Sequence, residues 1–389
     1  MARILMAGLP AFGLANPSLP LAAALVEAGH TVDFLQGESF RQRVERTGAT
    51  LIPFGFYLDG PLTDPRQLIR HGKRLFTDMS DAMIKLGPQY DAVVGTGIQP
   101  QLPRVERALD RPVICASPVF FQNDRTAKHL AAISTGLPAP ARRLFRTPAL
   151  RRAAAAVGGA VVFGTQLGDL INLLGPRSST LNLTVASREY QPFPDDFPGA
   201  VFMGPTPTQR IPDPDFPLDR LRAHDGPVFY ATLGTVFNTW TPFFRTIAEA
   251  FAGTDHLVVL TTGSQEGLAK LGDVPDNVIA RAFVPQVDVL EHADVCFTHG
   301  GFGTATDAVT LGVPPVLTPM GADQFFNAYR LEELGAGTVL PKGGFTVESV
   351  RKAADDAMTG DRSGLNALRE SFVAAGGPKL GVSAIEAVL

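Results

Sequence analysis

The most informative segment of the chain is THGGFGT at residues 298–304, where three glycines separate an apolar run from an amphipathic stretch. Val295–Thr298 is a predicted buried strand and a predicted helix follows at Thr304, so the glycines form a strand-to-helix turn. Glycine allows close approach of a ligand, and a helix N-terminus offers free N–H groups and a positive dipole end. The segment predicts a phosphate-binding turn, to which His299 could add a hydrogen bond; a turn required only for packing is the alternative.

Further residues near this turn fit a nucleotide ligand. Thr304 and Asp307 are three residues apart and share a helix face, where Asp307 can accept hydrogen bonds from the vicinal hydroxyls of a ribose. Phe283 ends a predicted strand and could stack on a base or belong to the core. Asp323 and Gln324 lie on a loop that either faces the same cleft or is simply solvated.

The elements that must position these residues follow from the alternation of short apolar runs with amphipathic stretches. This pattern predicts an α/β fold with doubly wound parallel sheets. Predicted strands are Arg3–Ala7, Thr31–Leu35, Ala49–Phe54, Ala92–Val94, Val113–Ala116, Val228–Leu233, His256–Thr261, Val278–Phe283, Val295–Thr298 and Pro315–Leu317. Predicted helices include Pro20–Ala28, which Gly29 should end, Asp64–Lys85, Pro103–Ala108, Pro242–Phe251, Val287–His292, Thr304–Leu311 and Val382–Leu389. Residues 187–226 are crowded with Pro and Asp, which predicts a linker over the surface.

Composition narrows the classes of function. The 389 residues are 45% hydrophobic and 19% charged, which suits two globular domains. The formal net charge of −4 lacks the basic excess expected of a nucleic-acid binder. Cys115 and Cys296 are too few for a disulfide framework or a zinc site. The apolar run 153–164 is shorter than the ~20 residues of a membrane-spanning helix, and prolines interrupt the N-terminal apolar region that could otherwise be a signal peptide. We therefore expect a soluble, cytoplasmic protein.

Three ordered motifs make a family resemblance specific: FVPQ, THGGFGT and TATDAVTLGVPPVLTPMGADQ. They resemble the donor-binding region of the family-one inverting glycosyltransferases of GT-B fold, in particular the bacterial branch that decorates antibiotics and other small aglycones. VFYATLGT at 228–235, MGP at 203–205 and the first strand-loop-helix extend the likeness over most of the chain. The resemblance implies two Rossmann-like domains facing a cleft: an acceptor-binding domain 1–205, a linker 206–226, a donor-binding domain 227–375 and a C-terminal helix 376–389 that crosses back to the first domain.

The resemblance also implies which residues hold the nucleoside of the donor. Phe283 would stack on the pyrimidine, with Val284 backbone atoms and Gln286 nearby. Asp307 would hold the ribose; the family usually has Glu there, so this side chain has a shorter reach.

The phosphates of the donor would lie on the glycine-rich turn. His299 would contact the diphosphate, and the turn of Gly301, Gly303 and Thr304 would complete the cradle through backbone amides and the Thr304 hydroxyl. Thr235, at the end of VFYATLGT, would reach the distal phosphate.

The remaining expectations concern the sugar and the partners. Asp323 and Gln324 would hold sugar hydroxyls. The family uses no catalytic metal, and the UDP or dTDP sugar is a co-substrate, so no cofactor is expected. The partners would be the nucleotide sugar and a small apolar aglycone, with a homodimer or an auxiliary protein as further options.

The first loop departs from the family pattern. The family typically has Gly-His-x-Asn-Pro, whose His deprotonates the acceptor, whereas residues 13–17 read GLANP and Leu14 cannot accept a proton. A general base contributes 10²–10⁴-fold, typically. Three explanations stay open: another base, with Glu38, Asp124 and His129 as candidates; an acceptor that needs little help, such as an amine, an acidic phenol or a carbanion-like carbon; or a protein that binds donor without transferring it.

The acceptor side carries weaker signals. Leu14, Phe56, Phe120 and Phe121 lie in apolar segments at or after predicted strand ends and could line an aglycone pocket, or be core. The sequence therefore favours an inverting, metal-independent glycosyltransferase. The alternatives are a non-catalytic nucleotide-sugar-binding auxiliary protein and a nucleotide-sugar epimerase, which would need an acid/base pair that the sequence does not reveal.

Overall fold

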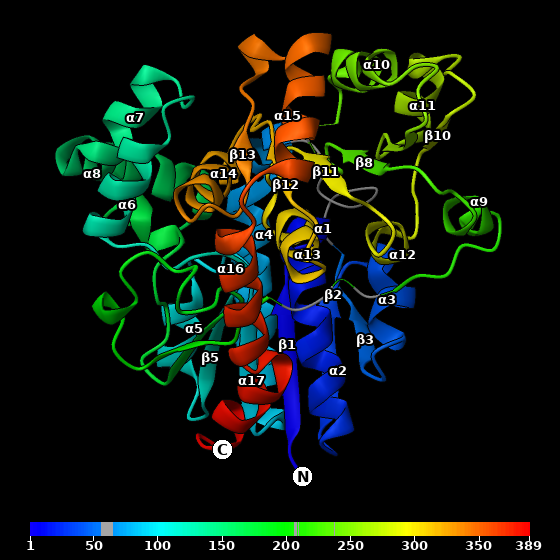
Figure 1. Cartoon of the computed structure of the whole chain (residues 1–389). Helices are drawn as coiled ribbons and strands as arrows, with labels where there is room; N and C mark the ends of the chain where they lie inside the picture. The colour runs from blue at the N-terminus through cyan, green and yellow to red at the C-terminus, as the bar shows by residue number, and fades with distance from the viewer. Residues whose placement is uncertain (56–64, 206–207, 209, 237) are drawn as a thin grey trace. The chain divides into compact units, whose positions relative to one another are not determined.

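The computed structural model describes residues 1–55, 65–205, 208, 210–236 and 238–389, with side chains described from residue 70 onward in the second of these ranges. The chain divides into two units. The first comprises Met1–Ala132, Pro138–Thr206 and Ser371–Leu389, and the second comprises Ile133–Leu137 and Pro207–Glu370. Each unit is built on one parallel β-sheet flanked by helices (Figure 1).

The first unit contains a seven-stranded sheet in the order β3-β2-β1-β4-β5-β6-β7. Its strands are β1 Arg3–Gly8, β2 Thr31–Gln36, β3 Thr50–Pro53, β4 Ala92–Thr96, β5 Val113–Ser117, β6 Leu181–Thr184 and β7 Ala200–Phe202. Every pairing is parallel, and in the central one Ile4 is opposite Ala92. β4 and β5 are buried along their whole length, which explains why they read as uninterrupted apolar runs.

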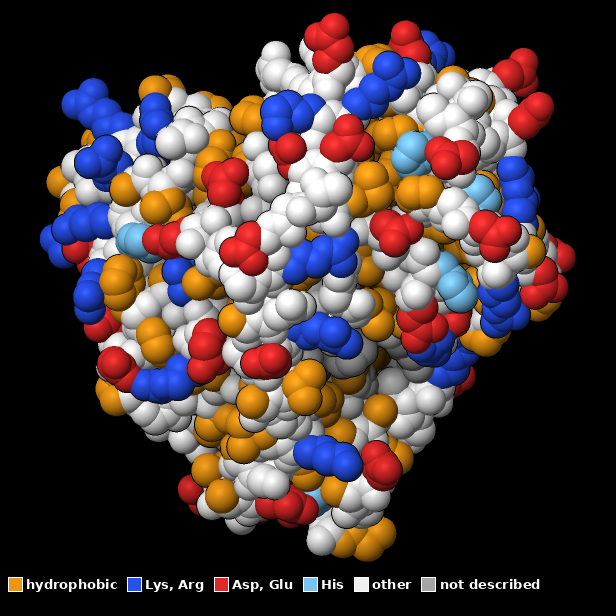
Figure 2. Space-filling view, in the orientation of Figure 1, with side chains coloured by type: hydrophobic (Ala, Val, Ile, Leu, Met, Phe, Trp, Pro, Cys, Tyr) orange, Lys and Arg blue, Asp and Glu red, His pale blue; other side chains and the backbone are white. Residues whose placement is uncertain are grey.

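The first unit also contains nine α-helices within the part of the chain that the structure describes. They are α1 Phe12–Ala15, α2 Leu19–Glu27, α3 Arg41–Glu45, α4 Pro65–Leu86, α5 Leu102–Ala108, α6 Asp124–Ile133, α7 Ala139–Arg146, α8 Pro148–Gly158 and α17 Gly377–Glu386. Gly29 follows α2 with a φ of 88°, a left-handed conformation that favours glycine, and ends the helix as its position in the sequence predicts. Basic side chains gather in Figure 2 where Figure 1 shows α7 and α8, whose sequences contain five arginines.

The second unit contains a six-stranded parallel sheet in the order β10-β9-β8-β11-β12-β13. Its strands are β8 Val228–Thr232, β9 Leu257–Thr261, β10 Val278–Arg281, β11 Val295–Thr298, β12 Pro315–Leu317 and β13 Thr338–Val339. Its helices are α9 Leu218–Arg222, α10 Thr241–Ala250, α11 Gln265–Leu271, α12 Gln286–Leu290, α13 Phe302–Thr310, α14 Gln324–Glu333 and α15 Val347–Thr359; α16 Ser363–Ala374 leads back to the first unit. The strand order reverses between β8 and β11, and ligands of such sheets bind beyond the carboxyl ends of the strands at that point.

The predicted doubly wound α/β architecture is confirmed, and so are the ten predicted strands apart from their ends. The prediction that residues 187–226 form a surface linker is wrong for residues 187–205. Tyr190 and Gln191 are buried, and β7 is a strand of the first sheet. The side-chain amide of Gln191 donates to the Phe121 carbonyl at 2.8 Å and its oxygen accepts from the Phe121 N–H at 2.8 Å. Prolines interrupt regular structure here, but the residues between them are held by packing.

The C-terminal helix α17 packs against α2 within the first unit. A Cβ added at Gly381 would overlap Met203 Sδ and lie 2.9 Å from Leu21 Cδ1, so these side chains would have to shift if the glycine were replaced. His30 Nε2 lies 3.1 Å from Glu386 Oε1. Among the described residues, no helix is both long and apolar enough to span a bilayer.

Candidate functional site

The glycine-rich turn connects β11 to α13 at the switch point of the second sheet. Gly300 has a φ of 77°, and Gly301 caps α13 in an extended conformation. Gly303, in the first turn of α13, is exposed, and a Cβ added there would meet nothing within 4 Å. The N–H groups of this first turn have no partner inside the helix, so the turn presents an open, positively polarised helix end.

The imidazole of His299 lies between two glycines that come from different strand ends. A Cβ at Gly234, which follows β8, would lie 2.8 Å from His299 Cε1, and a Cβ at Gly301 would overlap Nε2. The backbone of Gly234, with a φ of 67°, also requires glycine. Thr235, the next residue in the chain, is half-buried. Side chains at these two positions would therefore collide with the histidine ring in its present place.

The charge state of His299 follows from its surroundings. Burial lowers the pKa of His299 to about 4, so the ring is neutral near pH 7. Thr298 Oγ1 lies 3.1 Å from His299 Nδ1. When the threonine hydroxyl donates to Nδ1, the neutral ring carries its proton on Nε2, next to the two glycines. His299 is then a hydrogen-bond donor suited to a phosphate oxygen.

Asp307 lies inside a network of donors from its own unit. Only 4% of the residue is exposed. Its Oδ2 accepts from Gln286 Nε2 at 2.8 Å and from the Thr208 hydroxyl, and its Oδ1 accepts from the Thr208 N–H at 3.1 Å. Gln286 in turn accepts from the hydroxyls of Tyr230 at 3.3 Å and Thr304 at 3.4 Å. Burial raises the pKa of Asp307 to about 6 despite these hydrogen bonds.

Phe283 is an exposed aromatic side chain and not part of the core. Its exposed fraction is 56%, because β10 ends at Arg281, two residues before the predicted strand end. Val284, the next residue, is partly buried and packs against the apolar cluster of the second unit. An aromatic ring in water beside an anchored residue is a suitable stacking platform for a base.

The loop before α14 is tightly held by Gln324. Its side-chain oxygen accepts from the N–H groups of Met320 at 2.9 Å and Gly321 at 3.1 Å, which leaves the amide nitrogen as its remaining donor group. Ala322 in this loop has a φ of 54°, a conformation that costs a non-glycine residue about 1–2 kcal/mol. Such strain persists where the surrounding structure fixes the backbone, often at ligand sites.

Asn327 joins this loop to the phosphate turn. Its Nδ2 donates to Asp323 Oδ2 at 2.8 Å and to the Gly300 carbonyl at 3.2 Å, and the residue is fully buried. Burial raises the pKa of Asp323, and the hydrogen bond from Asn327 opposes this shift.

The eleven residues expected to contact the donor all lie in the second unit. Sequence reasoning missed a set of supporting residues: Thr208, Tyr230, Gly234, Ala322 and Asn327.

In the first unit, Leu14 lies in α1 and packs against the apolar cluster that contains Leu9 and Phe163. A Cβ at Gly97, which follows β4 with a φ of 81°, would lie 3.4 Å from Leu14 Cβ. Leu14, where the sequence resemblance leads one to expect a base, is therefore a packing residue against a neighbouring strand end.

Two of the three alternative bases are ion-paired. Glu38 accepts from Arg41 Nε at 2.5 Å and from a terminal nitrogen at 2.9 Å, and this arginine lowers the pKa of Glu38. Asp124 lies 2.6 Å from Lys128 Nζ and also binds Arg151; the lysine and then the arginine lower the pKa of Asp124. A lowered pKa makes a carboxylate a weaker proton acceptor, and both groups already have partners.

The aromatic residues of the first unit also have defined partners. His129, the third candidate base, contacts Phe193 edge-on with ring centroids 5.1 Å apart. Phe120 and Phe121, which the sequence places either in an acceptor pocket or in the core, are both buried. They pack against the aromatic residues of 187–205, the segment that was wrongly assigned to a linker. Phe56 lies outside the described residues.

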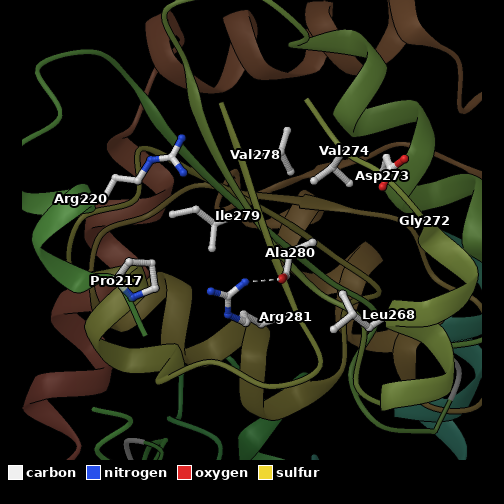
Figure 3. A pocket seen from close by; sticks show the side chains of 10 residues that line it. All are labelled: Pro217, Arg220, Leu268, Gly272, Asp273, Val274, Val278, Ile279, Ala280 and Arg281. Carbon is white, nitrogen blue, oxygen red and sulfur yellow. Dashed lines mark hydrogen bonds between the residues drawn. The ribbon is translucent and has the colours of Figure 1, made fainter. Parts of the chain in front are cut away.

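A separate cavity of about 500 Å³ lies along the edge strand β10, between α9 and α11 (Figure 3). Arg220, Asp273 and Arg281 are its charged lining residues. Arg281 donates to the Ala280 carbonyl at 2.9 Å, and Arg220 binds the Asp276 carbonyl. The lining includes none of the eleven expected donor contacts. Two arginines that cap backbone carbonyls are a way to protect a sheet edge.

Comparison with known proteins shows which class of protein this chain resembles. Residues 245–384 match the family model described as erythromycin biosynthesis protein CIII-like, C-terminal domain. The chain is 28% identical to "Uncharacterized UDP-glucosyltransferase YdhE" of Bacillus subtilis over 96% of this chain and 94% of that protein. It is also 28% identical to demethyllactenocin mycarosyltransferase of Streptomyces fradiae, over 100% and 87%.

Solved structures agree. The glycosyltransferase of kitacinnamycin superposes with a TM-score of 0.75 and 28% identity, covering 100% of this chain and 99% of that one. The chain has the GT-B fold, and over nearly its whole length it is similar to antibiotic-type glycosyltransferases, as the motifs predict.

Proposed function

We propose that the protein transfers a sugar, with inversion, from a UDP or dTDP sugar to a small, largely apolar acceptor. The observation that carries this proposal is the position of His299, held between Gly234 and Gly301 beside the open end of α13. A neutral imidazole donor and a free helix end suit a diphosphate. Both relatives named above are described as sugar transferases, and the name of one of them includes UDP.

The chemistry proposed for this site is stabilisation of the leaving group. Negative charge grows on the diphosphate as the bond to the sugar breaks, and donors already in place stabilise that charge without reorganisation. His299 and the first-turn N–H groups of α13 would supply these donors. Because they can do so alone, we propose that no metal or cofactor is needed and that the nucleotide sugar is a co-substrate.

The other donor contacts complete the proposal. The base would stack on Phe283, whose ring is exposed. The sugar would be bound by Asp323 and the Gln324 amide nitrogen, on a loop joined to the phosphate turn through Asn327. Fixing sugar and diphosphate on one rigid frame orients the bond that breaks.

Activation of the acceptor is the part that this chain does differently. Leu14 is a packing residue, and Glu38 and Asp124 are held by basic side chains. These contacts favour an acceptor that brings its own nucleophilicity over a relocated carboxylate base. The same observation supports the second candidate, a protein that binds nucleotide sugar without transferring it.

The test is a screen of UDP and dTDP sugars against a panel of amines, phenols and alcohols, with the product linkage assigned by NMR. A product whose anomeric configuration is opposite to that of the donor supports the proposal. Retention of configuration would contradict inversion. Tight binding of nucleotide with no product from any acceptor class would favour the non-catalytic candidate. The His299→Ala variant is the matched control, since it should lose both binding and product.

A further inference from the structure

The carboxylate of Asp307 is the group best suited to bind the hydroxyls of a ribose, yet protein donors already occupy it. Thr208 contributes two of these donors, its N–H to Oδ1 and its hydroxyl to Oδ2. Gln286 contributes the third, from Nε2 to Oδ2 at 2.8 Å. Both lone pairs of Oδ2 are therefore used before any ligand arrives, and so is one of the two on Oδ1.

The orientation of this network is set from both sides. If Gln286 turned its amide, its oxygen would face the Asp307 carboxylate in place of the donating Nε2, so the amide keeps the orientation in which its oxygen accepts from Tyr230 and Thr304. Thr208 is half-buried and lies far in sequence from α13, so it is a contact brought in by the fold. Asp307 itself is buried, and an unpaired buried carboxylate is costly.

The ribose hydroxyls of a bound nucleotide must compete with these protein donors for Asp307. A 2′-hydroxyl that replaces the threonine hydroxyl exchanges one hydrogen bond to a carboxylate for another of the same kind, and the exchange gains little. A 2′-deoxyribose leaves the threonine hydroxyl where it is and loses nothing. The two sugars should therefore bind with similar affinity, although a free carboxylate would favour ribose.

Resting on the proposed function, we infer that Thr208 is a specificity-determining residue: its hydroxyl occupies Asp307 and so makes the donor site indifferent to the 2′-hydroxyl of the nucleotide. Ribonucleotide and 2′-deoxyribonucleotide diphosphates are then both accepted. Removal of this one hydroxyl would expose a lone pair of Asp307 and create a preference for ribose.

The experiment is calorimetric titration with UDP and 2′-deoxy-UDP, which differ only in the 2′-hydroxyl. The ratio of the two Kd values is the readout, because a general loosening of the site would weaken both ligands alike. We expect a ratio within about threefold for the wild-type protein. Thr208→Val should raise the ratio in favour of UDP by about tenfold, the worth of one hydrogen bond to a charged group. Thr208→Ser keeps a hydroxyl and should behave as wild type.

The outcomes separate this inference from the proposed function. A wild-type ratio of tenfold or more, or a ratio that Thr208→Val leaves unchanged, overturns the role of Thr208 while nucleotide binding stands. No binding of either diphosphate overturns the donor site and this inference together. Should Thr208→Val lower the melting temperature, Thr208→Ala provides the same loss of the hydroxyl with less bulk, and its ratio decides.

Discussion

One methyl group at position 303 can separate the folding of α13 from the binding of a phosphate. Gly303 lies in the first turn of this helix, and a Cβ there would meet nothing within 4 Å. Alanine is better than glycine in a helix by roughly 0.5–1 kcal/mol. Because no strain offsets this gain, Gly303→Ala should raise the melting temperature by up to about 2–4 °C.

The same methyl group should weaken binding of a diphosphate. In a helix the Cα–Cβ bond tilts toward the N-terminus, so the methyl stands over the N–H groups of the first turn. A phosphate oxygen must come within about 2.9 Å of such an N–H, whereas a methyl carbon keeps other atoms at roughly 3.5 Å. Loss of one hydrogen bond to a charged group costs about 1.5–3 kcal/mol, or at least tenfold in Kd.

Thermal unfolding and calorimetric titration with UDP, on the same preparations, measure both effects. Gly158→Ala is the matched control, since Gly158 is helical with a φ of −70° and a Cβ there also meets nothing within 4 Å. It should stabilise the protein slightly and leave the Kd for UDP unchanged. A Gly303→Ala protein that is more stable and binds UDP as tightly as wild type would refute a diphosphate over this turn.

Four further variants test the rest of the site. His299→Ala should weaken UDP binding by at least about tenfold. The free ring has a pKa of about 4, and a bound anion must raise it, so UDP binding takes up a proton. When calorimetry is repeated from pH 7 down to pH 5, the affinity of the wild-type protein for UDP should therefore increase more than that of the variant. Phe283→Ala should cost about 1–3 kcal/mol of UDP binding with little change in melting temperature, since the ring is exposed. Burial raises the pKa of Asp307 to about 6, so between pH 4 and 6 the folded state holds a proton that the unfolded state has released. The free energy of unfolding of the wild-type protein should therefore fall as the pH rises through this range. Denaturant titration of Asp307→Asn should show a fall that is smaller by as much as about 3 kcal/mol. Leu14→His should not raise turnover on the native acceptor, and a large gain in kcat would show that the chain lacks a base it could use.

Most strands of the two sheets could be predicted, because a parallel strand that is buried on both faces appears in the sequence as a continuous apolar run. β4, β5 and β8 are buried throughout and read as continuous apolar runs. β6 and β7 leave no such trace: they hold four and three residues, and β7 is an edge strand that begins just after a run rich in Pro and Asp. Strands this short are specified by their neighbours in the sheet, and their own residues carry little signal.

The candidate site divides in the same way. The turn around His299 is local, so its glycines and the helix that follows could be recognised from consecutive residues. Thr208 and Tyr230 reach the site from other segments, and no local pattern marks a threonine that binds an aspartate 99 positions away. The exposure of Phe283 depends on where β10 ends, a boundary that periodicity places poorly.

The donor contacts that the resemblance predicts do not depend on the residue at position 14. The contacts expected for the diphosphate and the sugar all lie in the second unit, and Asn327 ties the sugar loop to the phosphate turn there. Leu14 lies in the first unit and packs against β4 and its neighbours, so its identity does not alter any of these contacts. A missing base costs about 10²–10⁴-fold only for acceptors that must lose a proton before they attack. An acceptor that is already nucleophilic avoids this cost, so the proposed function does not require a histidine at position 14.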